Sequence, residues 1–480
     1  MRFRGAFCIA AAALLAGCNV GPKYTRPSVP AAPAFKEQPP VEFKESKGWQ
    51  QAQPGDEQIR ADWWGIFNSA ELNALEQQVN PSNQTLKAAE ARFREARALI
   101  QLNRSKLYPT LSTAPAITTN RTSVNQPGGT ATKGEYGELT LPIDLNYEVD
   151  AWGRIHRSIA AAREETQATA ADLETIRLSV HAELAVDYFE LRSLDAQKQL
   201  LDRTLTAYHK ALDLTQNRYN GGLTSRAEVA QARTQLETTR AQDIGVGVDR
   251  AQFEHAIAVL TGNTPETLSL PTVALTSEPP VIPIGIPSLL LERRPDIAAA
   301  ERRVAEANEQ IGIAQAAFFP NLLITATGGF EGGSFVNWLT WPSRFWAVGP
   351  SVLETIFDGG RRRAAADSAT ASYDETVANY QQSALSAFQQ VEDNLSTLRI
   401  LSDQAKAQRV AVEAAQQSLD LSLSRYQGGL VTYLEVVTAQ TITLQNESTE
   451  VDLLRRRMDA SVMLIKALGG GWDVSKLPVS

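Results

Sequence analysis

The sequence predicts a mainly α-helical, internally duplicated chain of long coiled-coil helices that also carries two β-hairpins. Three observations support this fold class. Nearly the same hexapeptide occurs twice, as RYNGGL at 218–223 and RYQGGL at 425–430. Two stretches without proline, 154–218 and 361–425, are dominated by good helix formers. Finally, LTLPIDLNYEV at 139–149 alternates apolar and polar residues, which is the pattern of a half-buried strand.

The duplication extends through most of the chain. AAEARFREA at 88–96 matches AAERRVAEA at 299–307, and Gly-Arg pairs stand at 153–154 and 360–361. In both halves the arginine of the Gly-Arg pair precedes the arginine of the hexapeptide by 64 residues. Ordered landmarks at a near-constant offset indicate two structural repeats.

The N-terminus has the pattern of a bacterial lipoprotein signal peptide, which we assign to residues 1–17. A basic start and an apolar stretch end in Leu-Ala-Gly before Cys18. This cysteine is the predicted lipidation site, and its covalent lipid is the only cofactor we expect. A plain signal peptide with a chance cysteine is the alternative. In lipoproteins that this N-terminus resembles, aspartate after the cysteine favours inner-membrane retention, so Asn19 favours the outer membrane.

We divide the rest of the chain around the two repeats. In order, we expect an N-terminal collar segment at 18–67, a first repeat at 68–262, a linker at 263–292, a second repeat at 293–468 and a C-terminal tail at 469–480. Because the collar and linker are rich in proline, we expect extended segments that pack along the helices.

Strands are predicted at about 110–124 and 136–150 in the first repeat, and at about 321–331 and 345–357 in the second. Asp144 and Glu148 lie on the polar face of the second strand, so they are predicted to face a lumen. Four strands are too few to close a membrane barrel, and such barrels leave no edge exposed. The chain must therefore oligomerise: two copies would give a packed eight-stranded barrel, whereas three copies would give twelve strands and room for a lumen.

The helices of 64 residues between the landmarks are about 96 Å long, the length of a tube or spacer. Apolar residues recur every seven positions before the second hexapeptide, which indicates a coiled-coil seam that includes Tyr426. Each hexapeptide ends a long helix with glycines, and a new helix starts at once. Ser225 with Glu228, and Thr432 with Glu435, fit capping boxes. The hexapeptides are therefore predicted to be the sharp turns of two helical hairpins.

The composition excludes several classes of function. A formal charge of −8 and a pI near 5.3 argue against nucleic acid as a partner. The histidines of the mature chain are not paired at metal-ligand spacing, and no zinc-protease, nucleophile-elbow or Walker A motif occurs. We expect neither a metal site nor an enzyme.

The lipobox, the block ERRPDIAAAERRVAEANEQIGIAQAAFFPNL at 292–322, FDGGR at 357–361 and the doubled RYxGG turn resemble TolC/OprM-type outer-membrane efflux lipoproteins, the NodT-like outer membrane factors. The resemblance implies a trimer with a twelve-stranded barrel in outer-membrane lipid and a helical tunnel across the periplasm. It also implies a periplasmic adaptor protein and an inner-membrane pump as partners. The chain would then be the passive exit channel for drugs, toxic organic compounds or metal ions.

The resemblance also implies roles for the turns, which would form the periplasmic tip. The predicted tip and adaptor-contact residues are Arg218, Tyr219, Gly221, Gly222, Arg425, Tyr426, Gly428 and Gly429. Candidate gate residues are Glu435, Tyr433 and Glu228. Each has a simpler reading: the glutamates cap helices, the tyrosines pack at heptad positions, and the arginines complement helix dipoles.

Two other functions also fit parts of the pattern. An outer-membrane channel of a type I protein secretion system has the same architecture. A lipid-anchored coiled-coil scaffold without a pore accounts for the helices, but not for a strand that faces two environments.

Overall fold

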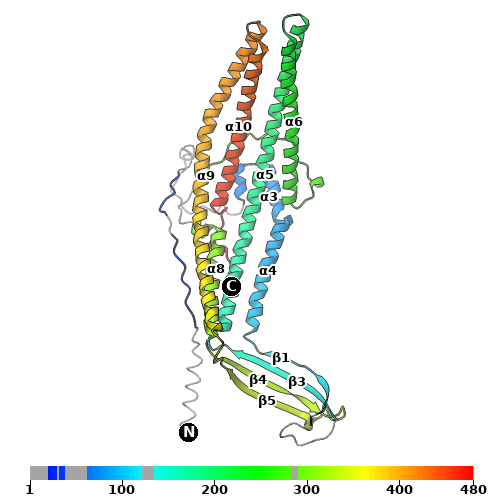
Figure 1. Cartoon of the computed structure of the whole chain (residues 1–480), viewed down its shortest axis with the longest axis vertical. Coiled ribbons are helices and arrows are strands. Elements are labelled where there is room, and N and C mark those ends of the chain that lie inside the picture. The colour runs from blue at the N-terminus through cyan, green and yellow to red at the C-terminus, as the bar shows by residue number, and fades with distance from the viewer. Residues whose placement is uncertain are drawn as a thin grey trace.

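The computed structural model describes residues 20–29, 32–37, 62–121, 123, 135–282 and 290–478. It is an elongated molecule with a sheet at one end and two helical hairpins that reach the other end (Figure 1). Cys18 and the signal peptide lie outside the described residues. Among the described helices, none is long and apolar enough to cross a membrane.

The duplication appears directly in the lengths of the helices. Helices α5 (Arg154–Asn220) and α9 (Arg361–Gln427) each have 67 residues. Helices α6 (Arg226–Leu260) and α10 (Tyr433–Ala467) each have 35 residues. The two repeats therefore build hairpins of equal length, α5 with α6 and α9 with α10, whose turns lie at the same end of the molecule (Figure 1).

A shorter helix precedes the strands of each repeat. Helix α4 (Gln84–Ser105) packs on α5, and α8 (Pro295–Ala316) packs on both α5 and α9; each has 22 residues. Helix α3 (Ala70–Ser82) leads into α4, and the one-turn α7 (Leu290–Arg293) leads into α8.

The strands form one antiparallel sheet. Strands β1 (Thr110–Ser112) and β2 (Ala116–Arg121) both pair with β3 (Glu135–Val149). The other edge of β3 pairs with β4 (Asn321–Gly332), which pairs with β5 (Arg344–Leu353). The two predicted hairpins are therefore neighbours in one sheet, joined at the β3–β4 ladder.

The predicted strand bounds need two corrections. The first strand, predicted as one segment at 110–124, is interrupted after Ser112 and resumes at Ala116. Pro115 lies in the gap, and proline has no N–H to donate to a ladder. The last strand ends at Leu353 rather than at 357, since its pairing with β4 stops where β4 begins at Asn321.

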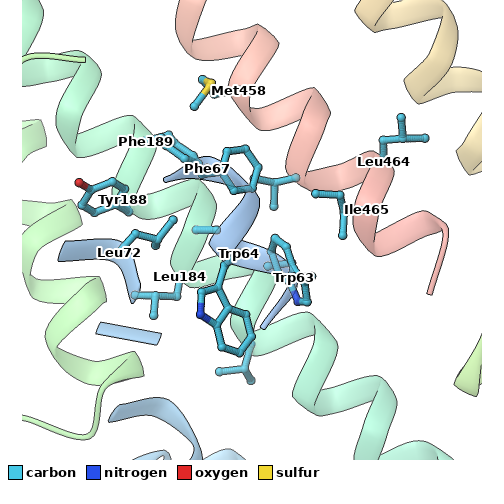
Figure 2. Packing of buried hydrophobic residues seen from close by; sticks show 14 of the residues in the cluster. Trp63, Trp64, Phe67, Leu72, Leu184, Tyr188, Phe189, Met458, Leu464 and Ile465 are labelled. Atoms are coloured by element: carbon cyan, nitrogen blue, oxygen red, sulfur yellow. The ribbon is translucent and has the colours of Figure 1, made fainter. Parts of the chain in front are cut away.

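The largest hydrophobic core among the described residues gathers side chains from η2 (Trp63–Phe67), α3, α5 and α10 (Figure 2). The 3₁₀ helix η2 places three aromatic rings between α3, α5 and α10. Trp64 stacks on His181 with ring centroids 4.4 Å apart. This part of the collar segment is thus a 3₁₀ helix in the core, whereas the sequence suggested an extended segment that packs along the helices.

The linker and the tail pack against the middle part of the helices, here called the equator. Two 3₁₀ turns, η3 (Pro265–Thr267) and η6 (Val474–Lys476), lie in these segments, and η5 (Trp341–Ser343) precedes β5. The buried Arg192 guanidinium donates to the carbonyl oxygen of Pro271 at 2.6 Å and to the Asp195 carboxylate at 2.7 Å. Trp472 in the tail packs on alanines of α5 and α8.

Candidate functional site

The two hexapeptides form the tip of the molecule, opposite the sheet (Figure 1). Each ends its helix with a Schellman motif. The N–H of Leu223 donates to the carbonyl of Arg218 at 2.8 Å, and that of Leu430 donates to the carbonyl of Arg425 at 2.9 Å. This turn needs a left-handed residue at its C′ position, which favours glycine. The sequence prediction of a glycine-ended helix at each hexapeptide is confirmed.

The second glycine of each pair meets that requirement. Gly222 has φ of 75° and Gly429 has φ of 74°, whereas Gly221 and Gly428 keep negative φ values. Substitution is therefore expected to strain the second glycine of a pair more than the first.

The N-termini of α6 and α10, which follow the two turns, differ from the predicted capping boxes. At the first turn the Ser225 hydroxyl accepts from the N–H of Glu228, but the Glu228 carboxylate accepts from the Thr224 hydroxyl at 2.5 Å instead of reaching back to Ser225. At the second turn Thr432 is the N-cap without a side-chain capping bond. Half of the first box forms, and the second does not form.

Tyr426 and Tyr433 form the core between the hairpins. Each is 1% exposed, and their rings meet edge to face with centroids 5.3 Å apart. The Tyr426 hydroxyl donates to the Glu228 carboxylate at 3.1 Å, across from one hairpin to the other. Burial raises the pKa of Tyr433 to about 12, so its hydroxyl stays protonated at neutral pH. In this conformation the Tyr433 ring is part of the tip core, as the packing interpretation predicted.

The two arginines of the hexapeptides have different surroundings. Arg218 donates to the carbonyl oxygens of Tyr426 at 2.8 Å and Gln427 at 3.2 Å, and its guanidinium lies 4.7 Å from the Tyr426 ring centroid. Arg425 forms an exposed ion pair with Glu435, at 3.5 Å within its own hairpin. Arg218 thus neutralises the carbonyl end of the opposite long helix, α9, instead of its own.

A second bridge between the hairpins lies further from the tip. The Tyr208 hydroxyl on α5 donates to the carbonyl oxygen of Gln440 on α10 at 3.2 Å. The Gln235 amide on α6 donates to the hydroxyls of Tyr208 and Thr441, both at 3.3 Å. No local pattern in the sequence indicates these cross-hairpin contacts, or those of Arg218 and Glu228.

The acidic residues of β3 are partly neutralised. The Glu148 carboxylate accepts from the Arg154 guanidinium at 2.7 Å, and the Asp144 carboxylate accepts from the Thr327 hydroxyl at 2.7 Å. Both lie on the same face of the sheet as Asn146, as the alternation predicted. Because Arg154 offsets its charge, Glu148 adds less negative potential there than the sequence alone suggests. Their placement toward a lumen stays a prediction.

A family model described as "Outer membrane efflux protein" matches residues 75–263 and 286–470, once for each repeat. The chain belongs to this family. The protein is therefore an outer-membrane channel of the kind that serves tripartite efflux pumps, with a helical domain built for the periplasm. Members of the family are channels rather than enzymes.

Relatives cover nearly the whole chain. The toluene efflux pump outer membrane protein TtgF of Pseudomonas putida is 30% identical over 98% of each chain. The cation efflux system protein CusC of Escherichia coli K12 is 29% identical over 97% of this chain and 98% of its own. The solved outer-membrane channel OprN is 28% identical, with a TM-score of 0.86 over 95% of this chain and all of its own.

Proposed function

We propose that three copies of this chain assemble into one continuous duct, with a twelve-stranded barrel in the outer membrane and a helical tunnel below it. The observation that carries this proposal is the open sheet. Its two edges, β1/β2 on one side and β5 on the other, have no partner among the described residues. An open edge is not tolerated in a bilayer, so the edges of neighbouring protomers must pair.

The apolar surface of the sheet supports the same proposal. Large apolar side chains on its strands are more than one third exposed; they include Leu111, Ile117, Ile143, Ile324, Trp346, Val348 and Val352. A soluble sheet would bury such a band, whereas a membrane barrel presents it to lipid.

The helical part also exposes apolar side chains that the single protomer does not cover. Helices α10 and α5 contact each other in the middle, while α9 and α6 lie on the two flanks (Figure 1). Ile244 and Val248 on α6, and Ile400 and Val410 on α9, are more than half exposed. We propose that α6 of one protomer packs against α9 of the next, so that six hairpins close the tunnel.

At the tip, the cross-hairpin contacts of Arg218 and Tyr426 hold the two turns together, which favours a narrowed entrance in the resting channel. An adaptor protein that binds the turns would separate them by competing for these contacts. The exposed rims of both turns, Tyr219, Leu223 and Leu430, supply apolar surface for that partner. An inner-membrane pump would then deliver the substrate.

We propose small molecules as the transported class and acylation of Cys18 as the second membrane attachment. Relatives are named for toluene efflux, cation efflux and pyoverdine export. Such different substrates on similar channels favour a duct without a selective binding site, in which the pump sets specificity. We propose no catalytic step.

The native mass of the detergent-solubilised mature protein tests this function. A trimer with three acylated chains is expected, and in planar bilayers it should conduct ions. A stable monomer would overturn the proposal, because four strand positions cannot close a barrel.

A further inference from the structure

Residues 20–29 and 32–37, here called the N-terminal strap, run along the outside of α8 and α9 toward the equator (Figure 1). Polar contacts fix the strap at several heights. The Tyr24 hydroxyl donates to Glu301 of α8, and Arg26 donates to the Tyr380 hydroxyl of α9 at 3.3 Å. Further along, the Glu392 carboxylate accepts two backbone N–H groups of the strap at 2.7 and 2.8 Å.

The first residues of the strap lie in an unusually close contact. Gly21 has φ of +118°, and a Cβ there would stand 2.6 Å from the Cα of Gly312 on α8. A Cβ on Gly312 would in turn stand 2.4 Å from Cδ of Arg157 on α5. Two side-chain-free positions therefore let the backbone of the strap, the backbone of α8 and one arginine pack together.

Arg157 fixes this contact electrostatically. It is 4% exposed, pairs with Glu309 at 2.8 Å and donates to the carbonyl oxygen of Pro22 at 3.4 Å. Asn308 donates to the same carbonyl at 3.3 Å. A buried arginine is costly unless it is paired, and the Nε atom of Arg157 has no hydrogen-bond partner among the described residues. An apolar side chain would fill the same space with a smaller desolvation cost. The presence of an arginine therefore favours a specific role for its hydrogen bond to the Pro22 carbonyl.

The contact lies where the helices meet the sheet. Arg157 is in the first turn of α5, and the N–H of Val20 donates to the carbonyl of Trp152 at 3.4 Å. Trp152 stacks on Phe319, with centroids 4.8 Å apart, and donates to the carbonyl of Pro320 at 2.8 Å. Amphipathic aromatic rings at the ends of strands are typical of the membrane–water interface.

We propose that Gly21, Arg157 and Gly312 form a positioning clamp for the lipid anchor, which holds the chain next to Cys18 at the edge of the membrane sheet. This inference rests on the proposed acylation of Cys18. Two peptide units separate Cys18 from Val20, a span of at most about 7 Å. The clamp therefore ties the acyl chains to the level at which the strands enter the bilayer.

The clamp has a consequence for assembly. A tether raises the effective concentration of what it holds only when its length matches the distance to be spanned. An anchor held at the strand ends keeps the open sheet of each protomer at the bilayer surface, where partner sheets are found. Loss of the clamp leaves the protein acylated and bound to membrane, but slows the formation of oligomers.

A nitroxide label tests the clamp itself. Cys8 is lost with the signal peptide and Cys18 is acylated, so Lys23→Cys supplies a single free thiol for the label. We expect restricted label motion in the full-length acylated protein and in Gly65→Ala, a matched control because a Cβ at Gly65 meets nothing within 4 Å. Gly312→Ala and Arg157→Met should increase label mobility severalfold. Unchanged spectra in both would overturn the clamp.

A spacer tests the positioning role without touching any clamp contact. Four residues, Gly-Ser-Gly-Ser, are inserted between Asn19 and Val20, and intact mass verifies full acylation. We expect restricted label motion as in the parent, but oligomer formation slowed at least threefold in a pulse-chase followed by native mass spectrometry. Parent-like assembly kinetics would refute positioning by the clamp. A parent protein that never forms oligomers would instead count against the proposed channel, while the label spectra would still decide the clamp.

Discussion

The two hexapeptide turns have nearly the same sequence and the same backbone, yet opposite environments. Tyr219 is 40% exposed, whereas Tyr426 is 1% exposed and forms the tip core. Arg218 reaches across to the opposite hairpin, whereas Arg425 pairs within its own. The two repeats share the turn because the backbone geometry requires the same glycine pair. The side chains around the turn differ because different elements lie beside each hairpin.

The same divergence occurs at the equator. His181 on α5 corresponds in the repeat to Phe388 on α9. His181 lies 2.6 Å from the Glu76 carboxylate, and both side chains are buried. Phe388 packs against the apolar core. One repeat therefore contains a buried titratable pair at the position where the other has only an apolar ring.

The largest difference between the repeats is expected on truncating the two tyrosines. Tyr426→Ala removes a buried ring and its hydrogen bond to Glu228, which should cost about 3–4 kcal/mol. Tyr219→Ala should stay within about 0.5 kcal/mol, since its ring is substantially exposed. Hydrogen exchange of the tip amides measures both. Equal protection in the two variants would contradict the assigned asymmetry.

The pair at the equator predicts a pH dependence. Burial raises the pKa of Glu76 from 4.5 to about 9, and burial, followed by the nearby Arg177 charge, lowers that of His181 from 6.5 to about 4. Taken alone, the Glu76 contribution is lost as pH rises from 4.5 to about 9. The His181 contribution is lost as pH falls from 6.5 to about 4. Between pH 4.5 and 6.5 the two trends cancel, because folded and unfolded states bind equal numbers of protons.

Above pH 6.5 only the Glu76 trend remains. The free energy of unfolding should therefore fall by about 1.4 kcal/mol per pH unit up to about pH 9. Glu76→Gln keeps the shape but cannot titrate. The variant should lose this alkaline slope and gain an acidic one below pH 6.5 from His181. Thermal unfolding of both proteins between pH 5 and 9 measures the slopes. Parallel curves would show that Glu76 is ionised in the fold.

An intermediate effect is expected for the two arginines. Arg218→Gln removes two bonds to the α9 carbonyls and a cation–π contact, together about 1–2 kcal/mol. Because these contacts join the hairpins, the conductance in planar bilayers should rise. Arg425→Gln breaks only an exposed pair and should leave the conductance near that of the parent. A larger rise for Arg425→Gln would place the closing contact in the second turn.

The smallest effects concern the glutamates that follow the turns. Glu228→Gln weakens charge-assisted bonds from Thr224 and Tyr426 and should cost about 1 kcal/mol. Glu435→Gln should change stability by less than about 0.5 kcal/mol, since its pair with Arg425 is exposed. Chemical unfolding monitored at the tip distinguishes the two. Should Glu435→Gln instead raise conductance with unchanged stability, it would be a gate residue after all.

Local rules predicted much of this fold. Proline-free stretches, glycine pairs and strict alternation act within a few residues, so the long helices, both turns and the strand of 139–149 were recognisable. The seam through Tyr426 was also visible as a heptad repeat, and its burial confirms it. Pro115 is a local signal of the break in the first strand, since proline cannot donate to the ladder.

Contacts between hairpins were not predictable in this way. Arg218 contacts Tyr426 only because two hairpins from distant parts of the chain lie side by side. No local sequence period predicts which residues of the two hairpins meet. The first capping box forms only in half for the same reason, because the Glu228 carboxylate accepts from Thr224 and from a tyrosine of the other repeat. At the equator, Trp64 is core since its neighbours come from α5 and α10.

The equal lengths of the paired helices make the chain a double ruler. Both long helices have 67 residues, and both returning helices have 35. Removing one heptad from both helices of a single hairpin would move its turn back by about 10 Å. The turn would then lie beyond the reach of Arg218. Removing the same heptad from both hairpins would shorten the tube and keep the tip intact. Length changes in such a protein are therefore expected to occur in matched pairs, seven residues at a time.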